Sequence, residues 1–555
     1  MTITGARGEG RVAYARKLYL PIGVLLAVIT AAAIAIGYKS IVGQIHFQDD
    51  AYYYLVIANN LVSHGLSSFD GIHYTNGYHP LWMVLLYLLF VLMGPHAQPA
   101  QQVLAVASLE QSLYVTSVVM CLVFALRLAS RRTAIGVGFV FVAIWLVSPA
   151  HGIFSQGMET TLATLLLIGL LFCISERYLR VAGLLMGLLA LARLDTAVFI
   201  GLPLVVWTFA QRKAPWLKLR CILPFGALLA CYMLSNFITT GHAEPISGAL
   251  KSSFPAIHWQ GGFLREPLLL AQRFGWTTLL LTANIIFVIG ALIVSALGLV
   301  LGAKGGNGSH AARTAWIISL LLVLNLLAFQ RWTKSIDPRY FALPTVAAIF
   351  SAGYAIARIV LDPRRTPLYI FVKGVFGFVL AMTVLVAPAY ALRAASKLAV
   401  VPGADREISR MRAIGALLPA GSIIAGTDVG ALSFWSGHRV INLDGLVNDW
   451  DYQRVIRDKG LKQYLHAEGV SYIATPIVSR WPAYTTRPIE PMYRQAIDPA
   501  AVAGLAYPPH AFYVYSYLYG VYSDSVLLPM QDEVFRDHVG SDGYMDIVYV
   551  VYHLR

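Results

Sequence analysis

The chain has 555 residues, of which 57% are hydrophobic and only 13% are charged, and its mean hydropathy is +0.64. A soluble globular protein carries roughly 25% charged residues. The composition therefore excludes an ordinary soluble domain and predicts a polytopic α-helical membrane protein. The net charge of +14 is typical of basic cytoplasmic loops, and we do not expect a nucleic-acid partner.

Apolar stretches long enough to be candidate membrane spans follow one another through most of the chain. A crossing helix needs roughly 20 apolar residues. The candidates lie near residues 18–40, 81–94, 101–128, 133–149, 158–175, 179–193, 195–211, 219–239, 277–303, 312–330, 339–360 and 366–390.

Basic clusters near residues 127–132, 176–180, 211–220, 304–313 and 358–365 orient these spans, because basic residues mark cytoplasmic loops. The orientation requires an odd number of crossings, 11 or 13. To meet it, either 81–94 is re-entrant or interfacial, or 101–128 is split into two helices.

These patterns divide the chain into three parts. Residues 1–17 form a basic cytoplasmic tail ahead of an uncleaved signal-anchor. Residues 18–390 form the transmembrane domain, with a long first outer loop at 41–80. Residues 391–555, where hydropathy drops, alternate short apolar strands with helices, which predicts a soluble α/β domain on the outer, periplasmic side.

The first outer loop begins with Gln48-Asp49-Asp50-Ala51-Tyr52-Tyr53-Tyr54. Ionisable residues at a membrane edge indicate a functional site by default, although one aspartate could simply cap the next helix. Tyr54, Ile57, Ala58 and Leu61 follow helical spacing. We therefore expect an amphipathic helix whose tyrosines lie in the membrane interface.

The polar motifs of the other outer loops face the same side as this pair of aspartates. Carboxylates can act as a general base or as metal ligands, and Arg and Lys bind phosphate. The combination suits transfer from a lipid phosphate to a hydroxyl. The candidates are Asn76, His79, Glu159, Arg193, Asp195, His242, Lys251, Lys334, Asp337 and Arg339.

Several of these residues also have a plain structural alternative. Glu159 could complement the dipole of the following helix, and Arg193 could merely pair with Asp195. Arg339 could be a snorkelling residue, and His79 could anchor the chain at the interface. These alternatives stay open at the level of sequence.

Short motifs in a fixed order carry a family resemblance. They are Asp49-Asp50-Ala51-Tyr52-Tyr53, the stretch Tyr74 to Trp82, Gly157-Met158-Glu159, Arg193-Leu194-Asp195, the segment Gly241 to Lys251, and Asp428, Gly430 and Asp444-Gly445-Leu446 in the tail. Together they resemble the GT-C superfamily of polyprenyl-phosphate-sugar-dependent glycosyltransferases. Within it, the sequence is most similar to the mycobacterial terminal arabinofuranosyltransferase type. Leu194 and Asp195 depart from that type, which has Pro and Glu there.

The resemblance implies a GT-C-like fold, an active site on the outer face, a polyprenyl-phosphate sugar as donor and inversion at the anomeric carbon. The catalytic base would be Asp49 or Asp50. Asp49 is the favoured one, and Asp50 would orient it or bind a metal. A divalent metal is compatible with the family but is not indicated, and no residue is assigned as a metal ligand.

The sequence therefore predicts a multi-pass glycosyltransferase of the bacterial inner membrane that acts on a cell-envelope glycan or glycolipid. Arg193, Lys251 and Arg339 would hold the lipid phosphate, and Asn76, His79, Glu159 and Asp195 would also contact substrate. The alternative is a transporter or flippase of a lipid-linked sugar. It predicts charges in mid-span and helices broken in repeats, whereas here the charges lie at span ends.

Overall fold

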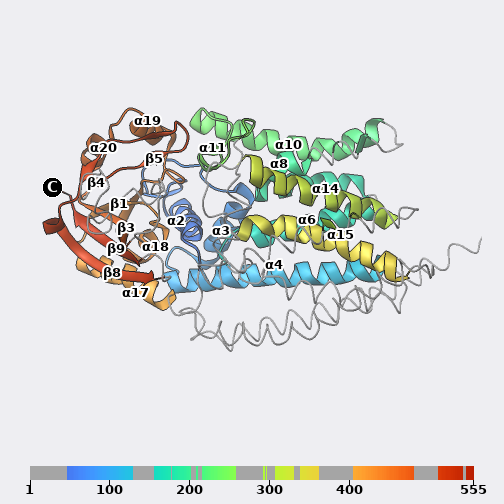
Figure 1. Ribbon diagram of the computed structural model, residues 1–555, viewed down its shortest axis with the longest axis horizontal. Coiled ribbons are helices and arrows are strands. Elements are labelled where there is room, and N and C mark those ends of the chain that lie inside the picture. The colour runs from blue at the N-terminus through green and yellow to red at the C-terminus, as the bar shows by residue number, and fades with distance from the viewer. Residues whose placement is uncertain are drawn as a thin grey trace, which may run out of the picture.

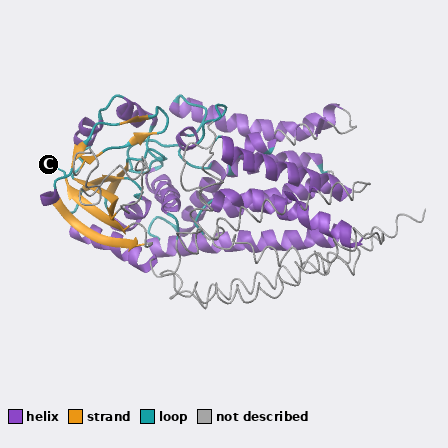
Figure 2. Ribbon diagram, viewed as in Figure 1, coloured by secondary structure: helices purple, strands orange, loops and turns teal. Residues whose placement is uncertain are grey.

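A computed structural model describes residues 47–128, 156–176, 178–201, 215–257, 307–329, 338–361, 404–480, 511–541 and 546–554, with a few single positions between 205 and 296. The expected tail, the first span, the spans near 133–149, 277–303 and 366–390, Lys334 and Asp337 lie outside these residues. Long helices occupy one end of the molecule and the strands gather at the other (Figures 1 and 2).

The helical region is a set of long apolar helices that lie side by side (Figure 1). Helix α7 packs against α6 and α10, and α14 packs against α6 and α15. The elements are α4 (Pro99–Leu128), α6 (Thr160–Glu176), α7 (Leu179–Ala192), α8 (Thr196–Phe199), α10 (Pro215–Thr240), α11 (Ile246–Lys251), α14 (Asn307–Ala328), the 3₁₀ helix η3 (Pro338–Phe341) and α15 (Ala342–Leu361).

The stretch 101–128 is not split, because α4 runs unbroken for 30 residues, about 45 Å at 1.5 Å per residue. Helix α3 (Pro80–Met93) has only 14 residues. Within the described residues, one stretch, Ile222–Thr240 of α10, is long and apolar enough to cross a membrane, and four other apolar helices are shorter. The number of crossings, 11 or 13, stays a prediction.

Helices α3 and α10 expose large apolar side chains. Leu92 of α3 is 85% exposed and Ile238 of α10 is 73% exposed. A soluble monomer rarely leaves such side chains in contiguous patches. These surfaces are consistent with the membrane setting that composition predicts.

Helix α2 (Asp49–His64) lies between the helical region and the C-terminal domain (Figure 1). Residues 51–58 of this helix are buried, and Tyr52, Tyr53 and Tyr54 are at most 6% exposed. The expectation that these tyrosines lie in the membrane interface is wrong. The apolar face that periodicity detected packs instead against α3 and against α18 of the C-terminal domain.

The C-terminal domain is built on a mixed five-stranded sheet with the order β2-β1-β3-β9-β8. Strands β2, β1 and β3 are parallel, and β9 and β8 are added antiparallel. The elements are α17 (Ala404–Leu417), β1 (Ile423–Gly426), α18 (Gly430–Ser436), β2 (Arg439–Asn442), α19 (Trp450–Arg457), α20 (Leu461–Ala467), β3 (Tyr472–Arg480), β8 (Glu533–Ser541) and β9 (Asp546–His553). Short pairs β4 (Ala511–Phe512) with β7 (Val526–Leu527), and β5 (Tyr515–Ser516) with β6 (Val521–Tyr522), complete it with η6 (Met530–Asp532).

The alternation of strands and helices that the sequence predicts is present in this domain. Between α19 and α20 the helical backbone is interrupted. Lys459 has a φ of 56° at the interruption. A non-glycine residue in that left-handed region marks a turn, so the apolar periodicity continues across a break in the backbone.

The C-terminal domain docks on the first outer loop through two close backbone approaches. A Cβ at Gly430 of α18 would lie 2.2 Å from the backbone oxygen of Asp49, and a Cβ at Gly77 would lie 2.0 Å from that of Leu446. Only glycine permits such approaches. The docking brings loops of the α/β domain over the ends of the helices.

Candidate functional site

A cavity of about 290 Å³ lies where the helix ends meet the C-terminal domain. Its charged and titratable lining consists of Asp50, Tyr53, Tyr54, Tyr78, His79, Glu159, Arg193, Asp195, Glu244, Lys251, Arg339 and Tyr340. Its apolar lining includes Ile57, Met158, Val198, Phe199, Phe254, Phe329, Leu446 and Val447. The cavity therefore presents a charged end and an apolar wall.

Asp50 is the centre of the charged end. One of its oxygens, Oδ2, accepts hydrogen bonds from Arg339 Nη2 at 2.5 Å and from Lys251 Nζ at 3.3 Å. Burial alone would raise the pKa of Asp50, but the two cations outweigh it and hold the pKa well below its ordinary range. The three side chains together carry one net positive charge.

Each of the two cations is placed by its own short element. Lys251 is the last residue of α11, whose first N–H, that of Ile246, donates to Asn76 Oδ1 at 3.0 Å. Arg339 lies in η3, and its Nη1 donates to Gln48 Oε1 at 2.9 Å. Asn76 itself is buried and does not line the cavity. It therefore positions Lys251 instead of facing a substrate.

Arg193 and Asp195 form an ion pair with each other, as the structural alternative for these two residues predicted. Arg193 caps the C-terminus of α7, and its guanidinium donates to both carboxylate oxygens of Asp195 at 3.2 and 2.9 Å. Both residues nevertheless line the cavity. The ring of Tyr340 lies 5.4 Å from the Arg193 guanidinium and 5.2 Å from that of Arg339, so it joins the two arginines.

Glu159 is one of the residues that line the cavity. Tyr54 donates its hydroxyl hydrogen to Glu159 at 3.4 Å, and His79 Nε2 lies 3.6 Å from the same carboxylate. No backbone N–H of α6 donates to this side chain. Burial lowers the pKa of His79. Among the residues that the structure describes, its Nδ1 is buried and has no hydrogen-bond partner.

Asp49 does not line the cavity. Its two carboxylate oxygens accept hydrogen bonds from the backbone N–H groups of Gly430 and Ala431, at 2.9 and 2.8 Å. These are the first two residues of α18. Asp49 therefore joins α2 to the C-terminal domain, and burial raises its pKa.

The α/β domain adds two further carboxylates beside Asp50. Asp444 accepts hydrogen bonds from Tyr53, Asn442 and the backbone N–H of Leu446. Asp428 follows β1 with a φ of 50°. Its side chain is exposed and lies within electrostatic range of Asp50, Asp444 and Lys251.

Most sequence-predicted residues meet at this cavity. Asp50, His79, Glu159, Arg193, Asp195, Lys251 and Arg339 line it, whereas Asp49 and Asn76 lie behind it. His242 is elsewhere, stacked on Trp450 with ring centroids 3.8 Å apart. Sequence reasoning missed Gln48 and Tyr340, for which adjacency to Asp49 and Arg339 is the only signal.

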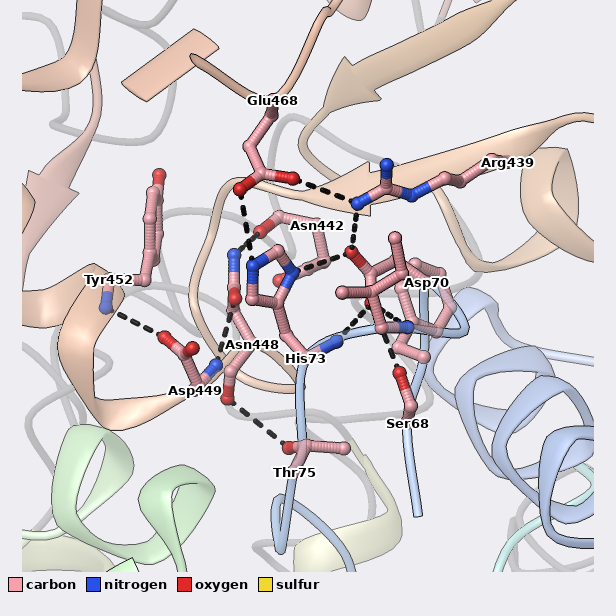
Figure 3. A network of polar contacts seen from close by, with 12 residues as sticks. Ser68, Asp70, His73, Thr75, Arg439, Asn442, Asn448, Asp449, Tyr452 and Glu468 are labelled. Carbon is pink, nitrogen blue, oxygen red and sulfur yellow. Dashed lines mark hydrogen bonds and ion pairs between the residues drawn. The ribbon is translucent and has the colours of Figure 1, made fainter. Parts of the chain in front are cut away.

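A second polar cluster joins the first outer loop to the C-terminal domain (Figure 3). His73 Nδ1 lies 2.7 Å from Asp70 and His73 Nε2 lies 3.2 Å from Glu468. Arg439 donates to both carboxylates, at 3.0 and 2.8 Å. Asp70, His73 and Glu468 lie close enough together to bind a metal ion. However, both ring nitrogens of His73 already contact carboxylates, and the Arg439 guanidinium contacts the same two carboxylates.

The described residues of the cavity likewise do not fit a divalent ion. Asp50 is engaged by two cations and Asp49 by two N–H groups. We assign no metal role to either cluster.

A family model described as a domain of unknown function (DUF8728) matches residues 398–521. No curated protein matches the chain.

Among solved structures, the chain is similar to the archaeal oligosaccharyltransferase AglB from Archaeoglobus fulgidus in complex with an inhibitory peptide and a dolichol-phosphate. The identity is 11% and the TM-score 0.47, over 82% of this chain and 69% of that one. It is also similar to the A. fulgidus oligosaccharyltransferase in complex with Zn and sulfate, at 12% identity and a TM-score of 0.44 over 81% of this chain and 67% of that one. Both TM-scores are low, so the proposals below rest on the geometry of the cavity. The resemblance to the arabinofuranosyltransferase type stays a prediction.

Proposed function

We propose that this protein is a membrane glycosyltransferase that moves a sugar from a polyprenyl-phosphate donor to a hydroxyl of a cell-envelope glycan or glycolipid. The observation that carries the proposal is the meeting of Lys251 and Arg339 on Asp50, at the charged end of a cavity with an apolar wall. Such a cavity is complementary to a lipid that carries a phosphate next to a long apolar chain.

Charge supports a phosphodiester as the ligand. A sugar linked through one phosphate to a polyprenol carries one negative charge, and the Asp50–Lys251–Arg339 cluster carries one net positive charge. Arg and Lys also make charge-assisted hydrogen bonds to phosphate oxygens. They would stabilise the negative charge that develops on the leaving phosphate as the sugar departs.

The apolar wall would take the first isoprene units. Val198, Phe199, Phe254 and Phe329 line the cavity next to the helical region, which exposes large apolar side chains on α3 and α10. The lipid would then extend from the cavity along the membrane-facing helices.

Arg193, Asp195, Glu159 and His79 are the groups left for the sugar. Carboxylate, guanidinium and imidazole groups can together accept hydrogen bonds from several hydroxyls and donate hydrogen bonds to them. In the proposed complex these residues surround the sugar, while Lys251 and Arg339 hold its phosphate.

The proposed location is the bacterial inner membrane, with the C-terminal domain outside the cytoplasm. This location rests on the alternation of basic loops along the sequence. It puts the cavity on the outer face, where lipid-linked sugars meet the cell envelope.

The test is lipid binding and sugar transfer by the full chain in nanodiscs. We expect wild type to bind a polyprenyl phosphate and not the corresponding polyprenol, and to transfer label from one of a set of radiolabelled polyprenyl-phosphate sugars to envelope glycans. Lys251→Ala and Arg339→Ala should weaken lipid-phosphate binding about tenfold or more, since hydrogen bonds to charged groups contribute about 1.5–3 kcal/mol.

Lys462→Ala is the matched control, because Lys462 is exposed on the C-terminal domain. The proposal fails if the polyprenol and its phosphate bind equally well. If liposomes show translocation of the lipid-linked sugar without any transfer product, the flippase alternative replaces it.

A further inference from the structure

The described lining of the cavity holds four carboxylates, and one of them has no partner. Asp50, Glu159 and Asp195 are engaged by basic or hydroxyl side chains that also line the cavity. Within the part of the chain that the structure describes, the carboxylate of Glu244 has no hydrogen bond or ion pair. Both of its oxygens can therefore accept hydrogen bonds from a ligand.

Glu244 is held in place through its backbone. Asn76 Nδ2 donates to the carbonyl oxygen of Glu244 at 3.4 Å, and Asn76 Oδ1 accepts from the N–H of Ile246 at 3.0 Å. One side-chain amide thus fixes the chain on both sides of Pro245, at the start of α11. The first outer loop therefore sets the position of Glu244 at the cavity, while the Glu244 side chain stays unbound.

The exposed lining residues show where the cavity opens. A residue that borders a cavity and is also exposed to solvent lies at a mouth of that cavity. Among the described lining residues, Val198, Glu244 and Phe254 are exposed. Two of these side chains are apolar and one is acidic.

The apolar opening belongs to the helical region. The ring centroid of Phe254 lies 6.1 Å from that of Phe199 in α8 and 5.2 Å from that of Phe329, which follows α14. Ile257, three residues further along the chain, is 73% exposed. This opening suits the apolar chain of the donor lipid.

The acidic opening lies beside the C-terminal domain. Glu244 stands four residues beyond Thr240, where the candidate membrane span of α10 ends, and two residues beyond His242, whose ring stacks on Trp450 of α19. Helix α11 then leads from this side to Phe254, and it lies between the long helices and the C-terminal domain (Figure 1). Because an ionised carboxylate is costly in lipid, we expect Glu244 to face water.

Charge decides which substrate is complementary to Glu244. The donor phosphate is an anion, which a carboxylate repels, whereas the hydroxyl groups of a sugar donate hydrogen bonds to a carboxylate. Hydrogen bonds with an ionised acceptor are also stronger than those between neutral groups. A saccharide that approaches from the aqueous side therefore fits this opening, and a polyprenyl phosphate does not.

We propose that Glu244 is the acceptor-binding residue of the transferase. The acceptor saccharide enters the cavity from the aqueous side, and Glu244 accepts hydrogen bonds from its hydroxyl groups, while the donor lipid uses the apolar opening. This assignment rests on the function proposed above. The chemistry that is recognised is a sugar hydroxyl, carried either by a soluble glycan or by the headgroup of a glycolipid.

Steady-state transfer by the full chain in nanodiscs tests the assignment. One series offers soluble envelope oligosaccharides and a second offers glycolipids within the nanodisc, and the series that wild type uses identifies the source of the hydroxyl. Glu244→Ala should raise the KM for that acceptor about tenfold or more, the loss expected for a hydrogen bond to a charged group. Glu244→Gln should raise it less, because the amide oxygen still accepts.

The kcat, the binding of polyprenyl phosphate and the thermal unfolding midpoint should stay near wild type in both variants, because the Glu244 carboxylate has no partner within the described residues. Asp451→Asn is the matched control. Asp451 is a 76% exposed carboxylate next to Trp450 and does not line the cavity, so its substitution should leave the acceptor KM unchanged.

A measurement without any substrate tests the two openings. The four native cysteines are replaced by serine, and a spin label is attached through Glu244→Cys or Phe254→Cys. Collisions with a water-soluble nickel chelate should be more frequent at position 244, and collisions with oxygen, which concentrates in lipid, should be more frequent at position 254. Equal values at both positions, or the reverse order, would overturn the assignment.

Three kinetic results would overturn the assignment while leaving the proposed function intact. The first is an acceptor KM of Glu244→Ala within about twofold of wild type, well short of the loss of such a hydrogen bond. The second is a fall in kcat at unchanged acceptor KM, which would place Glu244 in the chemical step. The third is weakened binding of polyprenyl phosphate, which would place Glu244 on the donor side. If wild type neither binds polyprenyl phosphate nor transfers sugar, the proposed function fails and the acceptor assignment fails with it.

Discussion

At the scale of single residues, the site depends on charges that compensate one another. Asp50 holds Lys251 and Arg339 together, and those two cations in turn hold its pKa low. Asn76 acts on the site indirectly, because its side-chain amide oxygen holds the start of α11, the helix that ends in Lys251. Substitutions at Asp50 and at Asn76 should therefore have different effects on stability and lipid binding.

Asp50→Asn should lower the thermal unfolding midpoint, because two partly buried cations lose their anionic partner and an uncompensated buried charge is strongly destabilising. Polyprenyl phosphate supplies a negative charge at the same place. It should therefore stabilise Asp50→Asn by a larger shift in midpoint than it gives wild type. Equal shifts, measured by thermal unfolding with and without the lipid, would contradict the placement of the phosphate at these cations.

Asn76→Ala should leave the buried N–H of Ile246 without an acceptor, which costs about 1–3 kcal/mol. The resulting displacement of α11 should also weaken lipid-phosphate binding through Lys251. Asn60→Ala is the control. Asn60 bonds to Ser68 and Phe69 in the same loop, so this change should lower stability and leave lipid binding unchanged.

At the scale of elements, α2 is the piece that joins the two halves of the molecule. Its three consecutive tyrosines each contact a different part. Tyr52 packs on Phe434 of α18, Tyr53 donates to Asp444, and Tyr54 donates to Glu159 at the start of α6. Periodicity correctly indicated an amphipathic helix, but not which surface would cover its apolar face.

The contact of α18 with α2 should be sensitive to one added methyl group. Gly430→Ala would put a Cβ against the backbone oxygen of Asp49, and overpacking a fixed contact typically costs about 1–3 kcal/mol. We expect a lower unfolding midpoint, because α18 is displaced from α2. Gly226→Ala in α10 meets no atom within 4 Å and should be neutral or slightly stabilising. Similar effects of the two changes would argue against close docking.

At the scale of the whole molecule, the C-terminal domain docks on the helical region and adds Leu446 and Val447 to the cavity lining. The polar cluster in Figure 3 is part of that docking, since it joins Asp70 and His73 of the first outer loop to Arg439 and Glu468 of the α/β domain. One of its members, His73, has a raised pKa.

The hydrogen bond to Asp70, with the charges of Asp70, Glu468 and Asp449, raises the pKa of His73 despite its partial burial. The stabilisation from protonated His73 is therefore fully present below the unfolded value of about 6.5. It is lost as pH rises through the folded-state pKa. Arg439 also faces Asp70 and Glu468 and keeps its charge throughout, so part of the docking remains.

Wild type should accordingly lose more thermal stability between about pH 6 and about pH 9 than His73→Gln does. The measurement is the unfolding midpoint of both proteins across that range. His466→Gln, at an exposed histidine of α20, should follow wild type. Parallel curves for wild type and His73→Gln would rule out this contribution.

Local patterns were sufficient for the elements and for the choice of polar residues. Helical spacing predicted α2 and the apolar helices, and alternating strands and turns predicted the α/β tail, because these signals depend on neighbours a few residues apart. Of the nine candidates to which the sequence assigned a catalytic or binding role, seven line one cavity, as the position of polar motifs at span ends indicated. The membrane setting, the crossings and the outer location remain predictions from composition and loop charge.

Roles within the cavity could not be predicted in the same way. Whether a carboxylate is a base, a partner for a cation or a clamp for a helix depends on groups hundreds of residues away. Asp49 and Asp50 are adjacent in sequence, yet one accepts N–H groups from α18 and the other meets Lys251 and Arg339. Sequence determined that the aspartate pair would matter. Only the tertiary structure decided what each aspartate does, because burial and the charge of neighbours, which set proton affinity, exist only in the folded molecule.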